Sequence, residues 1–211
     1  FTTIAEKTVP SGLTSILSAL SPLVVFLGST MIGLQKPTFK GFIGVFIGFL
    51  GVVFIFRDGL GDILDPNYKI GILFLSIAIL SWSIGTIYTK LHVHKSNNIA
   101  LNLFYQFSIA AVIQFVLALI FNPNVDFSTW SSRSIFATLY LAVFGSVIAF
   151  FCYHYAIKRV SAIQVSVLNY INTIIAVFLG WLLLDEVIKL DFVIATILII
   201  LGVFITNFKR K

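Results

Sequence analysis

The chain has 211 residues, of which 59% are hydrophobic and only 10% are charged. Soluble globular proteins carry about 25% charged residues, so the composition excludes an ordinary soluble domain and indicates a membrane protein. The net charge of +6 would suit nucleic acid, but the basic residues lie in separate short loops without clustered aromatic residues, and we expect no nucleic-acid partner. The single cysteine, Cys152, lies inside an apolar segment and can form no disulfide within the chain.

Seven apolar segments follow one another along the chain, and a spanning helix needs roughly 20 mostly apolar residues. They cover residues 9–33, 39–56, 70–90, 99–121, 134–156, 160–184 and 190–208. We therefore predict an all-α integral membrane protein, a multi-span helical bundle in the lipid bilayer. Residues 1–5 are expected to be the end of a further span that begins upstream.

Two stretches, residues 9–55 and 160–206, repeat one pattern at an offset of 151 positions. Val9 falls on Val160, and Leu50-Gly51-Val52 falls on Leu201-Gly202-Val203. Five apolar segments begin between the start of one copy and the start of the next, so the second copy must be inverted in the membrane. Inverted repeats are an architecture of secondary transporters, which bind substrate at the midplane between the halves.

The repeat also predicts the domain organisation. We expect residues 1–57 to be the remainder of a first half, comprising the end of span three and spans four and five. Residues 58–69 would be a linker, and residues 70–211 a complete second half. Subtracting the offset from Ile70 puts the first equivalent span about 80 residues before Phe1, which predicts ten spans in two halves of five.

The loop charges predict the orientation. Alternating assignment of the loops puts nine Lys and Arg residues on one side, and five on the other together with all eight acidic residues. Because cytoplasmic loops carry the excess of Lys and Arg, we expect the C-terminus to be cytoplasmic.

Several motifs carry a family resemblance. They are Tyr140 to Ala162, Phe178 to Glu186, Leu80-Ser-Trp-Ser-Ile-Gly85 with Thr89-Lys90, and Ser18-Ala-Leu-Ser-Pro-Leu23. In these segments the chain resembles the EamA family of the drug/metabolite transporter superfamily. The resemblance implies a multi-pass permease of the cell (inner) membrane, and we expect no cofactor. The family usually has Pro where this chain has Thr173, and Glu where it has Gln35.

Every acidic residue lies at the end of a span or in a loop, and none lies in the interior of a span. Charges within a span are costly and are usually functional, so their absence argues against proton exchange at a buried Glu. A sugar-phosphate site would need Lys or Arg near the midplane. We therefore predict export of a small neutral or zwitterionic metabolite, such as an amino acid. A non-transporting scaffold or assembly protein is the main alternative, and a membrane-embedded enzyme is a less favoured one.

Pro22 is the only proline near the middle of a span, so the helix is expected to bend near Ser18–Pro22. Two helical stripes of small and polar residues align under the repeat, and they could face one solute pathway or could simply pack helices together. The first stripe is Ser11, Ser15, Ser18, Pro22 and Ser29, and the second is Ala162, Ser166, Asn169, Thr173 and Gly180. Aromatic and amide groups elsewhere would complete the wall. The predicted pathway residues are Ser18, Ser21, Pro22, Trp82, Thr86, Tyr105, Tyr153, Asn169, Asn172 and Thr173.

Two further features allow more than one interpretation. Gly41, Gly44, Gly48 and Gly51 form a smooth helix face that predicts close packing, with a homodimer seam as the alternative. His154 lies inside a span and is interpreted as a packed histidine, with a proton relay as the alternative.

Overall fold

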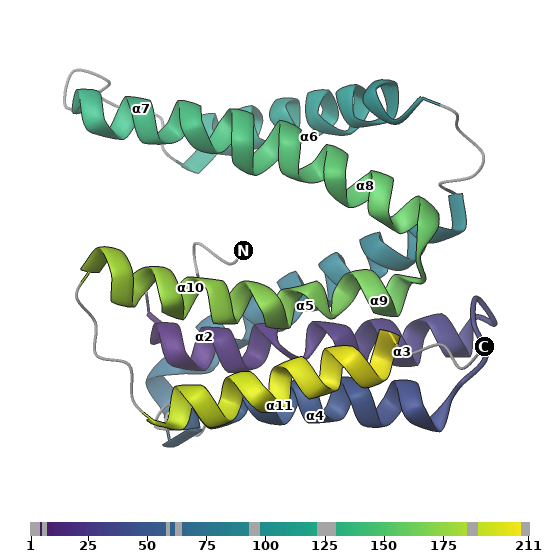
Figure 1. Ribbon diagram of the computed structural model, residues 1–211. Helices are drawn as coiled ribbons and strands as arrows, with labels where there is room; N and C mark the ends of the chain where they lie inside the picture. Colours follow the sequence, from purple (N-terminus) through teal and green to yellow (C-terminus); the bar gives the residue numbers. More distant parts are fainter. Residues whose placement is uncertain are drawn as a thin grey trace. The chain divides into compact units, whose positions relative to one another are not determined.

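The computed structural model describes residues 5, 8–57, 60–61, 65–92, 98–121, 130–184 and 190–207, and within them it is helical without a strand (Figure 1). The chain divides into two compact units. Unit 1 comprises Phe1–Leu91 and Val160–Lys211, and unit 2 comprises His92–Arg159. These units differ from the predicted halves of the repeat, residues 1–57 and 70–211, and that division of the chain stays a prediction.

Unit 1 holds both copies of the repeat. Its first part comprises α2 (Ser11–Ser18), α3 (Ser21–Met31), α4 (Phe39–Ile55), the short 3₁₀ helix η2 (Pro66–Tyr68) and α5 (Lys69–His92). Its second part comprises α9 (Ala162–Ser166), α10 (Leu168–Leu184) and α11 (Leu190–Asn207). The predicted segments match these bounds within two residues, except that 9–33 and 160–184 are each divided into two helices.

Local capping explains several helix ends. The Thr38 side chain accepts a hydrogen bond from the Gly41 N–H at the start of α4, and Ser161 and Gln164 form a capping box at the start of α9. Such caps satisfy the N–H groups that a helix leaves unpaired at its first turn. After α3, Gly33 adopts φ = 71°, a left-handed conformation that favours glycine and ends the helix.

The first copy is broken in mid-span. Helix α2 ends at Ser18, and the Leu20 N–H turns back to the Leu17 carbonyl oxygen at 2.9 Å. Helix α3 then begins at Ser21 with Pro22 in its first turn. Proline is tolerated in a first turn because that position needs no N–H donor. The bend predicted near Ser18–Pro22 corresponds to an interruption of the helix at Ala19–Leu20, where both residues keep right-handed helical dihedral angles.

The second copy is also broken, although it has no proline there, and the sequence did not predict this. The break falls at Val167, whose carbonyl oxygen accepts the Tyr170 N–H at 3.1 Å. Tyr170 is fully buried, and its hydroxyl donates to the Val45 carbonyl oxygen of α4 at 3.0 Å. The tertiary contact of Tyr170 thus lies three residues beyond the break.

Glycines let α4 and α11 pack backbone to backbone, in the most extensive helix pair of unit 1 (Figure 1). A Cβ on Gly202 would lie 2.8 Å from Gly48 Cα, and a Cβ on Gly51 would lie 3.0 Å from the Ala195 carbonyl oxygen. Gly44 faces Thr206, so the two helices run antiparallel. The packing interpretation of this glycine face is correct within the chain, and the face is not available for a homodimer seam.

Unit 2 consists of α6 (Ile99–Phe121) and a second long helix. The second helix comprises α7 (Ser132–Tyr140), the π-helical segment η4 (Leu141–Ile148) and α8 (Ala149–Arg159). Phe107 of α6 meets Phe150 of α8 edge to face, with ring centroids 5.4 Å apart.

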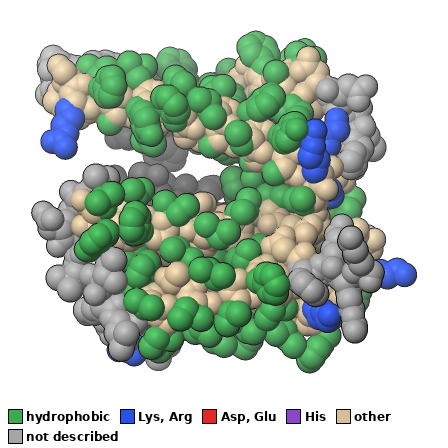
Figure 2. Space-filling model, viewed as in Figure 1, with side chains coloured by type: hydrophobic (Ala, Val, Ile, Leu, Met, Phe, Trp, Pro, Cys, Tyr) green, Lys and Arg blue, Asp and Glu red, His purple; other side chains and the backbone are tan. Residues whose placement is uncertain are grey.

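Among the described residues, length and apolar composition identify five segments that can cross a membrane: Leu13–Met31, Pro66–His92, Ile99–Ile120, Ser132–Arg159 and Ala162–Leu179. The apolar helices Phe39–Ile55 and Phe192–Asn207 are shorter. On the face in Figure 2, hydrophobic side chains cover the helices, whereas Lys and Arg lie near helix ends. In water so much exposed apolar surface would be unfavourable, whereas a bilayer covers it. The protein is therefore an all-α, multi-span membrane protein.

Candidate functional site

A pocket of about 320 Å³ lies beside the break of the first copy. It is lined by Ser18, Ser21, Leu75, Ala78, Ile79, Trp82 and Asn169, and we call it the polar pocket. Helices α2, α3, α5 and α10 each contribute to its wall. No side chain in this lining is ionisable, and the volume is near the lower end of the roughly 300–1,000 Å³ typical of small-molecule sites.

Two polar groups of the pocket come from equivalent positions of the repeat. Ser18 and Asn169 are related by the 151 offset, and the structure brings both to one pocket. Ser21 is buried, with its hydroxyl oxygen 3.4 Å from that of Ser83 on α5. The pocket therefore offers a hydroxyl and an amide near the breaks, opposite an apolar wall that includes the Trp82 indole.

Four other predicted pathway residues of unit 1 do not line the pocket. Pro22 is buried in the first turn of α3. The Thr86 hydroxyl donates to the Trp82 carbonyl oxygen at 3.0 Å, and the Thr173 hydroxyl donates to the Asn169 carbonyl oxygen at 3.2 Å. Asn172 is exposed on α10. A pathway role for these residues stays a prediction.

Both polar stripes are partly used for packing. The buried Ser29 hydroxyl donates to the Phe26 carbonyl oxygen at 3.1 Å and accepts from the Gln35 amide at 2.6 Å. The buried Ser166 hydroxyl donates to the Ile163 carbonyl oxygen at 2.8 Å. The polar pocket therefore involves the stripes only near Ser18 and Asn169.

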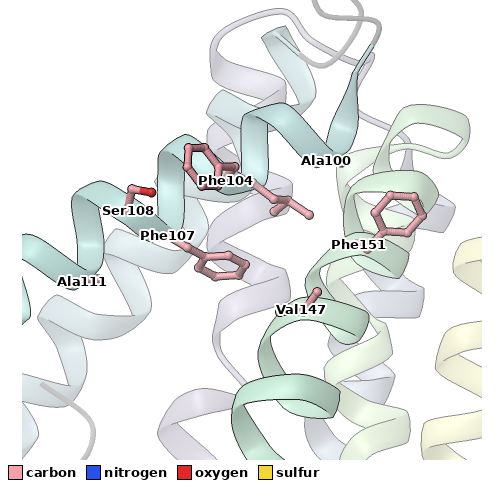
Figure 3. Close-up of a pocket in the computed structure, with 8 residues that line it drawn as sticks. Ala100, Phe104, Phe107, Ser108, Ala111, Val147 and Phe151 are labelled. Atoms are coloured by element: carbon pink, nitrogen blue, oxygen red, sulfur yellow. The ribbon is translucent and has the colours of Figure 1, made fainter.

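Unit 2 contains a second pocket, of about 440 Å³, which we call the phenylalanine pocket (Figure 3). Phe104, Phe107 and Ser108 come to it from α6, and Val147 and Phe151 come from the facing helix. The predicted residues Tyr105 and Tyr153 belong to this unit but line neither pocket. Tyr105 is exposed beside Phe104, and Tyr153 is half-buried against Phe150 and His154.

His154 is buried in α8, and its Nδ1 lies 2.9 Å from the Phe150 carbonyl oxygen. This distance favours the tautomer in which Nδ1 carries the proton and donates. Among the described residues, Nε2 has no hydrogen-bond partner. The contact to its own helix fits the interpretation of a packed histidine.

The sequence pattern did not single out Ser83, Leu75, Ala78 and Ile79. Only the fold shows that α5 passes the α2–α3 break with these residues facing it. Helical spacing from Trp82 could have suggested Leu75, Ala78 and Ile79, which precede it by seven, four and three residues on one helix face.

The fold and the pocket define a class: a multi-span membrane protein with broken helices beside a small polar pocket, an arrangement found in secondary transporters. The EamA-like transporter family model matches residues 69–208, and the chain belongs to this family.

Curated relatives agree with the family. The chain is 26% identical to the uncharacterized transporter YoaV of Bacillus subtilis, over 98% of this chain and 70% of the relative. It is 28% identical to the uncharacterized inner membrane transporter YedA of Escherichia coli K12, over 84% of this chain and 56% of the relative. It is 30% identical to an uncharacterized transporter of Buchnera aphidicola, over 96% of this chain and 68% of the relative. The chain thus spans between about half and seven tenths of these relatives.

A crystal structure matches the fold with a TM-score of 0.82 at 20% identity, covering 98% of this chain and 70% of that one. At this identity the match supports the fold alone.

Proposed function

We propose that the protein is a secondary transporter of the inner membrane that exports a small neutral or zwitterionic metabolite, such as an amino acid, by alternating access. The observation that carries the proposal is the polar pocket. Hydrogen-bonding side chains from equivalent positions of the two copies line this pocket together. The helices that form it are otherwise mostly apolar.

The chemistry of the lining supports the substrate class. An ionic substrate with a net charge would need a compensating charge, because an unpaired ion at this depth is costly. Ser18 and Asn169 instead offer neutral donors and acceptors, and Leu75, Ile79 and Trp82 offer an apolar surface. A solute with a polar head and a short apolar part would satisfy both.

Helix breaks beside the pocket support the proposed mechanism. Breaks within membrane helices are tolerated where the backbone lines a cavity, and transporters place substrate at such breaks. Both α2–α3 and α9–α10 are broken close to residues of the pocket. Because the two broken spans are equivalent under the repeat, one would bend to open the pocket to one side of the membrane, and the other would bend to open it to the opposite side.

A non-transporting scaffold is the alternative from another class. A scaffold would need the same folded helices but no specific solute. Quenching of Trp82 fluorescence by the solute would therefore favour the transporter, since Trp82 lies in the wall of the pocket.

The decisive experiment replaces Asn169 with Leu. A whole-cell metabolite efflux screen with the full-length protein first identifies the substrate. Loss of a polar contact costs on the order of 1–3 kcal/mol, so apparent affinity should fall roughly tenfold or more. Asn102→Leu is the matched control, because it makes the same exchange on α6, outside both pocket linings and outside the predicted pathway.

Wild-type transport by Asn169→Leu would contradict the proposal. Loss of folded protein without a selective loss of affinity would favour the packing interpretation. Interhelical hydrogen bonds in membranes average only about 0.6 kcal/mol, so we expect the variant to fold.

A further inference from the structure

The two copies of the repeat differ in the backbone that they bring to the polar pocket. Pro22 has no N–H, so the carbonyl oxygen of Ser18, four residues earlier, lacks the donor that a continuous helix would supply. In the second copy, Thr173 stands at the position of Pro22, and Asn169 stands at that of Ser18. The Asn169 carbonyl oxygen accepts the Thr173 hydroxyl at 3.2 Å, in addition to the N–H that is its regular partner within α10. A carbonyl with two donors in the second copy is therefore short of a donor in the first.

The Ser18 carbonyl group lies at the edge of the polar pocket. Ser18 is the last residue of α2, Ser21 is the first residue of α3, and both line the pocket. Carbonyl groups of a helix point toward its C-terminal end, so the Ser18 carbonyl points into the interruption between these two lining residues. Backbone groups without a helical partner are tolerated in a membrane where they border a cavity. The interruption therefore offers the pocket a hydrogen-bond acceptor from the backbone.

Two side chains of the pocket are also available to a solute. Among the described residues, neither the Ser18 hydroxyl nor the Asn169 side-chain amide has a hydrogen-bond partner. The hydroxyls of Thr86 and Thr173, by contrast, donate to carbonyl oxygens of their own helices. Ser18 thus supplies its carbonyl and hydroxyl oxygens, and Asn169 supplies its side-chain oxygen, so that two residues offer three acceptors.

Three acceptors at one small pocket match a primary amino group. A protonated primary amine has three N–H donors and no acceptor, and hydrogen bonds from a charged donor are stronger than those between neutral groups. A hydroxyl group would offer a single donor and would leave acceptors of the pocket unpaired. Sites built to pair with an N–H group reject analogues that lack it. The acceptors therefore favour an amino group over a hydroxyl group in the bound solute.

We propose that the polar pocket recognises a primary amino group of the solute, and that the Ser18 carbonyl oxygen is the acceptor that anchors it. The proposal rests on the proposed transport function, and it narrows the solute to a zwitterion that carries an ammonium group. The side-chain oxygen of Asn169 is the second acceptor, and the NH₂ group of the same amide is a donor for the carboxylate. Pro22 determines specificity through the Ser18 carbonyl without touching the solute.

The test compares two probes that differ only at the amino group. Full-length protein carries Trp130→Phe and Trp181→Phe, with any further tryptophan outside residues 1–211 also replaced by Phe, so that Trp82 in the pocket wall reports binding. Its fluorescence is titrated with L-leucine and with the N,N,N-trimethyl derivative of leucine. Both probes are zwitterions with the same apolar side chain, but only leucine has N–H donors. We expect leucine to bind roughly tenfold more tightly or better.

Pro22→Ala is the deciding variant, because the alanine N–H supplies the donor that the Ser18 carbonyl lacks. The apparent affinity for leucine should fall roughly three- to fivefold, whereas the affinity for the trimethyl derivative should not change. Pro10→Ala, at the start of α2, is the matched control, and we expect it to change neither affinity. Ser18→Ala removes the hydroxyl acceptor, should also weaken leucine alone, and decides the question if Pro22→Ala does not fold.

Several outcomes would overturn the amino-group site. Equal loss of affinity for both probes in Pro22→Ala would show that the proline acts only on the shape of the pocket. Equal binding of both probes to protein with Pro22 in place, or no response of Trp82 to leucine, would also overturn it. Efflux of a solute without an amino group would overturn this site and support the transporter. Leucine binding without efflux of any solute would instead contradict the transport function.

Discussion

The two copies of the repeat reach the same broken-helix architecture by different local means. The first copy breaks at Ala19–Leu20, where Pro22 occupies the first turn of the following helix. The second breaks at Val167 without a proline, and the nearby Tyr170 is anchored on Val45 of α4. A break in a membrane helix can thus be encoded in the local sequence or supported by a tertiary contact, and only the first kind is visible as a sequence signal.

The largest expected effect concerns the inversion on which this comparison depends. Asn67→Cys and Lys36→Cys, each in a Cys152→Ala background, should react with an impermeant thiol reagent from opposite sides, because α4 lies between them. The expected result is all or none: Lys36→Cys labels from the cytoplasm and Asn67→Cys from outside. Labelling of both from one side would contradict the inverted repeat, and Cys152→Ala alone serves as the unlabelled control.

A smaller effect is expected from Tyr170→Phe, which removes the hydroxyl contact near the second break. The Val45 carbonyl oxygen would lose its donor, so the free energy of unfolding should fall by about 0.6–1.5 kcal/mol. Thermal unfolding in detergent measures the change. Tyr155→Phe is the control, since Tyr155 is exposed on α8. Equal stability of both variants would show that the hydroxyl bond does not stabilise the fold.

The smallest effect is expected from Pro22→Ala. Because Pro22 lies in a first turn, alanine removes no hydrogen bond, and it could let α2 and α3 join into one straighter helix. We expect the protein to stay folded and transport to slow by a few-fold, about 1 kcal/mol or less at the barrier. Pro10→Ala, at the start of α2, is the control. Unchanged transport would show that the break of the first copy is incidental.

Sequence reasoning predicted the spans well because the bilayer dictates them. The predicted segments 70–90 and 99–121 correspond to α5 (Lys69–His92) and α6 (Ile99–Phe121), since a run of about 20 apolar residues has few alternatives to a spanning helix. The Val167 break has no proline to signal it, and the only long-range contact described near it, from Tyr170 to Val45, joins residues 125 positions apart.

The candidate site was predicted only in part. Ser18 and Asn169 were identified because the repeat relates them, and they do reach one pocket. Thr86 and Thr173 carry equally polar side chains, but their hydroxyls donate to carbonyl oxygens of their own helices. Residue type cannot distinguish these two outcomes, because both depend on which face of the helix meets a neighbour.

The α4–α11 pair has a consequence for biosynthesis. Gly48 and Gly202 meet in space, yet about 150 residues of chain must be made between them. At roughly 5–20 residues per second, α4 waits on the order of 10–30 s in the membrane before its glycine face can be covered. During that interval the bare face must be shielded by lipid or by an insertion factor. A chain whose synthesis ends before α11 would therefore leave its glycine face open to incorrect helix partners.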